Sequence, residues 1–392
     1  MAGNSNLGAA KSAKNDEFYT QYADIEKEIN AYIEYNPDVF RGKTVLLPCD
    51  DPEWSNFTKY FAQNFETLGL KKLISTSYAV ESKQYKEGYQ LTLFEEQSPN
   101  FDENKTRKNG KIFVLDHDTN NSGRIDINDL EWHYLEGDGD FRSNEVKALR
   151  DEADIIVTNP PFSLFREFLA WIVEADKQFV IIGNMNAITY KEVFPLIKEN
   201  KLWLGNGFNA GNAYFRIVGE NRDYASGVFD ENTGLVKFRN CCWFTNLEHG
   251  RRHQPLSLMT MADNIKFSKH KEIKGKEYAH YDNYDAIEVP FTDAIPNDYE
   301  GVMGVPISFL DKYCPEQFEI LGITKTWFEN LKTKTYPEQI QFSKNGSQLS
   351  VTKLNDGAAL MVKEVPINET YYKIGECMYI QMYARILIRK KQ

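Results

Sequence analysis

The sequence is poor in cysteine and has no long apolar run, and each shortage excludes a class of protein. The five cysteines of the 392-residue chain, at positions 49, 241, 242, 314 and 377, are odd in number and form no CxxC pair. This pattern indicates neither a disulfide framework nor a thiolate zinc site. No apolar stretch is long enough to span a bilayer, and residues 1–15 lack the apolar core of a secretory signal. We therefore expect a cytoplasmic protein with reduced thiols and no membrane partner.

An overall positive charge is also missing, because the formal net charge is −11. Basic residues gather instead in residues 251–276, where seven lysines and arginines stand against two acidic residues and give a local charge of +5. Such a segment is either a nucleic-acid-binding face or an ordinary solvated surface. The charge alone leaves both interpretations open.

Apolar runs alternate with helical patterns, which predicts an α/β fold with a doubly wound, parallel sheet. Residues 44–78 contain a strand, a helix and a strand, which is a βαβ unit with a right-handed crossover. Ser55 or Asn56 is expected to cap the helix of this unit, and Ser143 a later helix. The remaining expected elements are strands at 154–158, 179–184, 202–204 and 241–245, the last two antiparallel and separated by a long loop, and helices at 163–173 and 190–200.

The length of the chain favours two or three domains. Residues 81–135 interrupt the alternation with two strand-like pieces, 90–94 and 111–115, which we expect to form an inserted hairpin. The pattern ends near residue 250, and short strands, turns and basic residues follow it. We therefore predict one domain over residues 1–250 and a second, of mixed α+β structure, over residues 251–392.

Residues 118–129 match a twelve-residue calcium-binding loop. Oxygen-bearing side chains stand at positions 1, 3, 5, 9 and 12, and Gly123 stands at position 6. The twelfth residue is Asp129, where glutamate is usual, and a strand is expected before the loop in place of a helix. The stretch is therefore either a metal site or an Asx-rich turn without metal.

The apolar run at 154–158 leads directly into Asn159-Pro160-Pro161-Phe162. Prolines cannot continue the hydrogen-bond ladder of a strand, so Asn159 stands at the carboxyl end of a buried parallel strand, the edge at which α/β sheets bind ligands. The Asn159 side chain and the Pro160 carbonyl can accept hydrogen bonds from one amino group, while Phe162 can stack on a planar ring. The motif therefore suits an exocyclic amine on a heterocycle, and a simple strand-ending turn is the alternative.

Four motifs follow one another along the chain: Phe18-Tyr19-Thr20, the strand end at Asp50-Asp51, Gly139-Asp140-Phe141 and Asn159-Pro160-Pro161-Phe162. In this order they resemble the motifs of the adenine-N6 DNA methyltransferases, and more closely those of the EcoRI-type modification methyltransferases. The resemblance is greatest over roughly the first 250 residues. It implies a Rossmann-like methyltransferase sheet, the cofactor S-adenosylmethionine and a C-terminal target-recognition domain. It also implies double-stranded DNA as the partner and, within a restriction-modification system, a cognate restriction endonuclease acting on the same site.

The resemblance also implies roles for individual residues. Asn159 and the Pro160 carbonyl would accept both N–H bonds of an adenine amine, Pro161 completes the motif, and Phe162 would stack on the base after it is flipped from the duplex. Asp140 would bind the amine of the cofactor's adenine and Phe141 would pack on its ring. The full set of implied cofactor contacts is Tyr19, Thr20, Pro48, Asp50, Asp51, Asp140 and Phe141. The implied DNA contacts are Arg251, Arg252, Lys266 and Lys269.

The chain departs from the family pattern at two places. The glycine-rich loop expected after the first strand is replaced by Asp50-Asp51-Pro52, and the strand at 72–78 has no acidic residue at its end for the ribose hydroxyls. Asp50, Asp51 and Glu81 are the alternatives for that role. Phe208 and Tyr214 form either a second wall for the flipped base or a packed loop. The alternative functions are a protein glutamine-N5 methyltransferase, which uses a similar motif, and a catalytically silent DNA-binding protein, which would not need the glycine loop.

Overall fold

The computed structural model describes residues 19–50, 55–79, 99–208, 212–216, 227–328 and 331–391. The chain divides into two compact units. Unit 1 contains Met1–Met185 and Leu202–Gly250, and unit 2 contains Asn186–Lys201 and Arg251–Gln392. Unit 1 therefore ends where the sequence pattern changes, whereas the segment predicted as a helix at 190–200 belongs to unit 2.

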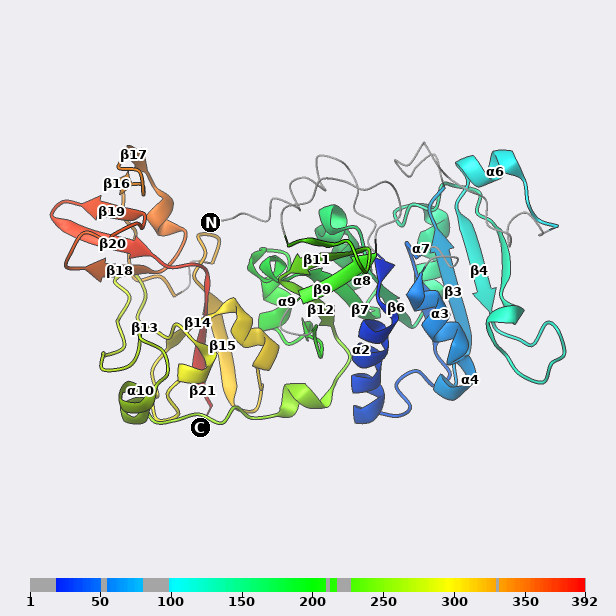
Figure 1. Ribbon diagram of the computed structural model, residues 1–392, viewed down its shortest axis with the longest axis horizontal. Helices are drawn as coiled ribbons and strands as arrows, with labels where there is room; N and C mark the ends of the chain where they lie inside the picture. Colours follow the sequence, from blue (N-terminus) through cyan, green and yellow to red (C-terminus); the bar gives the residue numbers. More distant parts are fainter. Residues whose placement is uncertain are drawn as a thin grey trace. The chain divides into compact units, whose positions relative to one another are not determined.

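Within the described residues, unit 1 contains a mixed sheet of eight strands in the order β5-β4-β3-β2-β6-β7-β12-β8 (Figure 1). Only β3, β2, β6 and β7 are mutually parallel, and every pairing toward either edge is antiparallel. The prediction of a parallel sheet is confirmed for its centre and wrong for one edge, while the antiparallel pairing of β8 with β12 is confirmed. The strands are β2 Thr44–Leu47, β3 Lys72–Ser77, β4 Lys111–Leu115, β5 Glu131–Tyr134, β6 Ile155–Thr158, β7 Gln178–Asn184, β8 Trp203–Leu204 and β12 Cys241–Thr245.

Helices pack on both faces of this sheet because alternate strand residues point to opposite sides. On one face, Val45 and Val157 belong to a buried cluster with Tyr32 of α2. On the other face, Phe165 of α8 lies 5.0 Å from Phe244 of β12, measured between ring centroids. The helices are α2 Tyr22–Tyr35, α3 Asn56–Gln63, α4 Phe65–Leu68, α6 Glu103–Lys108, α7 Asn144–Glu152 and α8 Phe165–Glu174.

The predicted helix signals are confirmed where they are local. Ser55 accepts a hydrogen bond from the Phe57 N–H at the start of α3, and Ser143 accepts one from the Val146 N–H at the start of α7. Gly69 ends α4 in the left-handed conformation, with φ 63°. Side chains that compete for backbone N–H groups favour such positions whatever the tertiary fold.

The segment between β8 and β12 is a second sheet, where the sequence predicted a long loop. Four strands lie in the order β1-β9-β11-β10 among the described residues, and Figure 1 shows β9 beside β11. The N-terminal strand β1 joins this sheet by pairing with β9, so a segment near residue 20 is held against one near residue 215. The strands are β1 Tyr19–Thr20, β9 Asn212–Arg216, β10 Phe229–Asp230 and β11 Leu235–Arg239.

The predicted inserted hairpin is also revised. Residues 90–94, its first half, lie outside the described residues. The second half is β4, which extends the main sheet by pairing antiparallel with β3, and β5 continues the sheet beyond it. This part of the predicted insertion therefore forms an edge of the main sheet.

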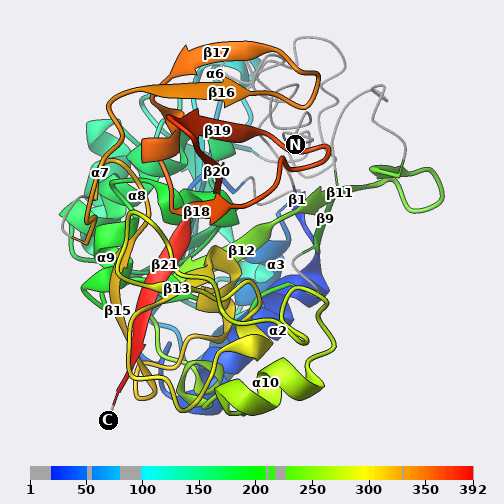
Figure 2. The same ribbon diagram turned by 90° about the vertical axis from the view of Figure 1, so that its left-hand side faces the viewer.

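Unit 2 contains two antiparallel-rich sheets in the part of the chain that is described, ordered β13-β14-β21-β15 and β17-β16-β19-β20-β18. Figure 2 shows the second sheet, drawn from orange to red. None of the helices in the described ranges has the length and apolar character needed to cross a bilayer. The elements are α9 Phe194–Lys198, α10 Met261–Phe267, β13 Ile287–Glu288, β14 Met303–Pro306, β15 Phe318–Ile323, β16 Gln339–Phe342, β17 Gln348–Val351, β18 Ala359–Val362, β19 Tyr371–Ile374, β20 Cys377–Gln381 and β21 Arg385–Lys390.

Candidate functional site

A buried carboxylate connects the carboxyl ends of the central strands. Asp50, which follows β2, is 7% exposed. Its Oδ2 lies 2.6 Å from the hydroxyl oxygen of Thr158, the last residue of β6, and its Oδ1 accepts a hydrogen bond from Ser55 at 2.9 Å. The Thr158 hydroxyl is also 2.6 Å from the Pro48 carbonyl oxygen. Asp50 and Pro48 therefore fix the loop after β2 against the strand that leads into Asn159.

The loop after β2 makes its turn without glycine. Cys49 adopts φ 68°, a left-handed conformation that favours glycine. The turn is held by β3, because the Asp50 N–H donates to the Thr76 carbonyl at 3.0 Å and the Ser75 hydroxyl donates to the Asp50 carbonyl at 2.7 Å. These two hydrogen bonds stabilise a turn that a glycine-rich loop would adopt without such support. Asp51 lies outside the described residues.

The N-terminal strand reaches the Asn159 side chain. Asn159 is half-buried, and its Nδ2 donates to Thr20 Oγ1 at 3.4 Å. Asn56, the first residue of α3, donates from Nδ2 to the Thr20 carbonyl at 2.8 Å. Thr20 is 2% exposed and is in register with Phe215, whereas Tyr19 is in register with the exposed Arg216. Successive strand residues face opposite sides, so Thr20 and not Tyr19 faces Asn159.

Phe162 lies against the four-stranded sheet β1-β9-β11-β10, which we call the small sheet. Its ring centroid is 6.3 Å from that of Phe215 and 6.1 Å from that of Phe238, both edge-on. Pro160 is buried, and Pro161 and Phe162 are half-buried. The motif therefore follows the end of β6, and residues of β9 and β11 pack against its Phe162.

Phe208 and Tyr214 are the two candidates for a second wall around the flipped base. Phe208 is packed in the core, and Tyr214 lies on the face of its sheet that points away from Phe162. Phe208 is 8% exposed and stacks on Trp243 at 5.4 Å, as the packed-loop interpretation predicts. Tyr214 is 40% exposed and lies on the side of β9 opposite Phe215. Neither ring is placed beside Phe162 as a second wall.

The loop that carries Asp140 lies beside the end of β3. The Ala79 N–H donates to the Asp138 carbonyl at 2.8 Å. Gly139 has φ 88°, and a Cβ there would collide with the Ser77 carbonyl oxygen, so glycine is required. Asp140 is bonded to Arg142, Nη2 to Oδ2 at 2.6 Å, and this hydrogen bond lowers the pKa of Asp140. An ionised acceptor is thus held at the same sheet edge as Asp50.

Phe141 is a core residue in this structure. It is 1% exposed, and its ring centroid is 5.1 Å from that of Phe168 and 5.7 Å from that of Trp171. A ring this buried offers no open face for stacking on a cofactor. Its predicted ring contact is therefore revised, and Phe141 instead anchors the loop that presents Asp140.

Tyr78 is a further candidate for the site, and the sequence did not single it out. It follows β3, where an acidic residue was sought, and it is half-buried. Burial raises the pKa of Tyr78, and the charges of Cys49 and Asp140 raise it further, so its hydroxyl stays protonated beside both residues. An aromatic residue at the carboxyl end of a strand was the signal available in the sequence.

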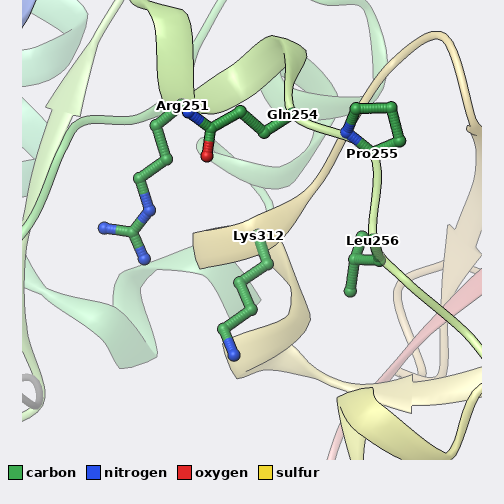
Figure 3. Close-up of a pocket in the computed structure, with 5 residues that line it drawn as sticks. All are labelled: Arg251, Gln254, Pro255, Leu256 and Lys312. Atoms are coloured by element: carbon green, nitrogen blue, oxygen red, sulfur yellow. The ribbon is translucent and has the colours of Figure 1, made fainter.

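The basic segment of unit 2 contributes to a pocket whose volume is about 220 Å³ (Figure 3). Arg251 and Lys312 both line it, and Arg251 is bonded to Asp311 at 2.6 Å. The remaining lining residues are Gln254, Pro255 and Leu256. The pocket therefore combines two cations with an amide and a short apolar wall.

The other predicted DNA contacts differ in accessibility. Arg252 is 4% exposed and donates to Asn200, so the structure contradicts its prediction as a surface phosphate contact. Lys266 is exposed on α10, with its Nζ 4.9 Å from the Phe267 ring centroid. Lys269 is exposed and is bonded to Asp293 at 2.8 Å.

The loop at 118–129 has the hydrogen bonding of an Asx-rich turn. Asp118 accepts bonds from the N–H groups of Ser122 and Gly123, and Asp129 Oδ1 accepts one from the Thr119 N–H at 3.0 Å. The hydrogen bond from the Asp126 backbone N–H lowers the pKa of Asp129 most, and the bonds from Thr119 and Asn120 lower it further. In the ranges that the structure describes, no cluster of three or more His, Cys, Asp or Glu side chains is arranged to hold a metal ion. Calcium binding stays a prediction.

Comparison with known proteins supplies the family. Residues 6–391 match the family model described as adenine-specific methyltransferase EcoRI. The chain is 44% identical to the type II methyltransferase M.EcoRI of Escherichia coli, over 83% of this chain and 90% of that protein. It is 35% identical to the type II methyltransferase M.MpnI of Mycoplasma pneumoniae, over 83% of this chain and 89% of that protein. No solved structure matches the chain significantly. The large mixed sheet with helices on both faces fits a methyltransferase fold.

Proposed function

Because this chain belongs to the EcoRI family of adenine-specific methyltransferases, a family of site-specific DNA methyltransferases, we propose that it methylates the N6 amine of adenine in duplex DNA. The observation that carries the proposal is Asn159-Pro160-Pro161-Phe162 at the carboxyl end of the central strand β6, covered by Thr20 and the small sheet. The names of the relatives favour this function over glutamine methylation and over a silent DNA-binding protein.

Hydrogen-bond acceptors at this strand end give the motif its role. The Asn159 Oδ1 and the Pro160 carbonyl accept the two N–H bonds of the target amine, which directs its nitrogen lone pair toward the methyl donor. Phe162 holds the base by stacking on its ring. A base in a duplex cannot reach such a pocket, so the adenine is flipped out before it reacts. The chain thus contributes positioning and preorganised dipoles.

The residues beside the motif fit S-adenosylmethionine, which supplies an activated methyl group when bound. Asp140, kept ionised by Arg142, is an acceptor for an amine or hydroxyl of a nucleoside. Tyr78 offers a protonated hydroxyl at the end of β3, where ribose contacts are expected in such folds. Asp50 orients the loop after β2, since its carboxylate is already bonded to Ser55 and Thr158.

We assign the recognition of the DNA target site to unit 2, which would be the target-recognition part of the enzyme. Arg251 and Lys312 line one pocket and suit a phosphate group of DNA. Lys266 and Lys269 are exposed and add to the positive charge of the same unit. A restriction endonuclease that cuts the same site is the partner expected for a type II methyltransferase.

The test is methyl transfer to DNA. The purified protein is incubated with unmethylated bacterial genomic DNA and S-adenosylmethionine carrying a labelled methyl group, and the DNA is digested to nucleosides. Label in N6-methyldeoxyadenosine, at one sequence context, is the expected result. Label in no nucleoside, or in a cytosine derivative, would refute the proposal.

A further inference from the structure

The small sheet β1-β9-β11-β10 has one apolar and one basic face. Strand residues alternate between faces. Ala213, Phe215, Val236 and Phe238 are buried on the inner face, where Phe215 and Phe238 contact Phe162. The alternate residues point outward and are exposed or half-buried. We define the outer sheet face as Tyr214, Arg216, Lys237 and Arg239.

The register of the strands places Lys237 between the other two cations of this face, Arg216 and Arg239. Lys237 is directly opposite Tyr214, and its Nζ lies 5.7 Å from the Tyr214 ring centroid. Arg239 is opposite Asn212, and Arg216 is two residue pairs away from Tyr214 along β9. Outward residues two positions apart on a strand are separated by roughly 7 Å. The cations therefore form a diagonal row across two adjacent strands, with Lys237 between Arg216 and Arg239.

A second feature of these cations is that no carboxylate in the described part of the chain pairs with them. Among the described residues, no ion pair involves Arg216, Lys237 or Arg239, and Lys237 contacts the Tyr214 ring. Other exposed cations are ion-paired at some positions and not at others, although the whole chain has a net charge of −11. Three adjacent cations repel one another, and an anionic partner would remove that repulsion. Paired examples are Arg41–Asp38, Arg107–Glu103, Lys269–Asp293 and Arg389–Glu319.

The face is next to the motif that receives the target base. Phe215 and Phe238 separate it from Phe162 by the thickness of one sheet. The same sheet contains Thr20, whose hydroxyl is 3.4 Å from the Asn159 amide nitrogen. We infer that the outer sheet face binds the backbone phosphates of duplex DNA beside the flipped adenine. This inference rests on the proposed function.

Duplex DNA fits this face better than an isolated acidic side chain does. Each DNA strand presents one phosphate per 3.4 Å of helix axis, so a group of cations spaced by roughly 7 Å can contact several phosphates at once. Such contacts position the duplex without reading its sequence. The Tyr214 ring helps to hold Lys237 in place, as a cation over an aromatic face.

The experiment neutralises the face and measures binding to DNA. The variant Arg216→Gln, Lys237→Gln, Arg239→Gln is compared with a control, Arg41→Gln, Arg107→Gln, Arg389→Gln, that loses the same charge from paired surface cations. Affinity for a fluorescein-labelled duplex of mixed sequence is followed by anisotropy between about 50 and 200 mM salt.

The test variant should lose affinity by about tenfold or more at low salt, and the slope of log K against log salt should fall by about 2 to 3, close to 0.9 for each lost phosphate contact. Its KM for DNA should rise while its melting temperature and its affinity for S-adenosylmethionine stay those of the wild type. The control should bind DNA as the wild type does.

Two results overturn the inference and are distinguishable from failure of the proposed function. If the wild type methylates genomic DNA and the test variant keeps the wild-type affinity and salt slope, the outer sheet face does not bind DNA. If the control loses as much affinity as the test variant, overall charge and not this face explains the effect. A wild type that forms no N6-methyladenine refutes the proposed function itself.

Discussion

Replacing Asn159 with alanine tests the target site most directly. The Asn159 amide is oriented by Thr20, which accepts from its nitrogen at 3.4 Å, and this orientation presents the oxygen as an acceptor for the target amine. The amine nitrogen becomes positively charged as it is methylated, so this hydrogen bond strengthens in the transition state. Removing one such preorganised group costs about 2.7–4 kcal/mol, or about 10²–10³ in kcat.

The same substitution should leave the fold and cofactor binding nearly intact. The hydrogen bond from the Asn159 side chain to Thr20 is long and the side chain is half-buried, so the free energy of unfolding should change by less than about 1.5 kcal/mol. Single-turnover methylation measures the chemical step, calorimetry measures affinity for S-adenosylmethionine, and circular dichroism reports the melting temperature. Thr20→Val is the matched control, because it removes the orienting partner and keeps the acceptor, and it should slow methylation by less than about tenfold.

Either of two results would refute this reasoning. An unchanged kcat in Asn159→Ala would show that the amide does not contact the reacting amine. A loss of cofactor affinity as large as the loss of rate would place Asn159 in the cofactor site.

Three further predictions follow from named contacts. Thr158→Val removes the hydroxyl bonded to Asp50 and should destabilise the protein by about 1.5–3 kcal/mol in urea unfolding, whereas unchanged stability would show that this bond is not needed. Asp140→Asn should weaken cofactor binding by about tenfold or more. Because Arg142 lowers the pKa of Asp140, the carboxylate is ionised throughout the range from pH 5 to 8. Its contribution to cofactor affinity is lost only as the pH falls through that lowered pKa. A ratio of wild-type to variant cofactor affinity that changes between pH 5 and 8 would contradict this. Millimolar calcium should leave the melting temperature unchanged if 118–129 is an Asx-rich turn, and a rise would reveal a metal site.

Short-range signals in the sequence predicted the centre of unit 1. The apolar runs that became β2, β3, β6 and β7 are buried on both faces, which is what a parallel central strand requires. Asn159 follows β6 directly because proline cannot continue the ladder. These features depend on neighbouring residues, so they are visible without the fold.

Other features depend on distant partners and were predicted incorrectly. The apolar pattern of β9 and β11 is short, and these strands become a sheet only by pairing with each other and with β1. Phe141 and Arg252 look like candidate ligand contacts in the sequence, yet both are buried by residues from other elements. Burial of a side chain is decided by what packs over it, which spacing along the chain does not reveal.

The sequence by itself therefore determined which residues could carry the chemistry and that Asn159 stands at a strand end. Only the tertiary structure decided which residues meet there. Thr20 reaches Asn159 across 139 positions of the chain, and Asp50 reaches Thr158 across 108. Strand order and helix packing create these contacts, and both result from burying apolar surface over the whole unit.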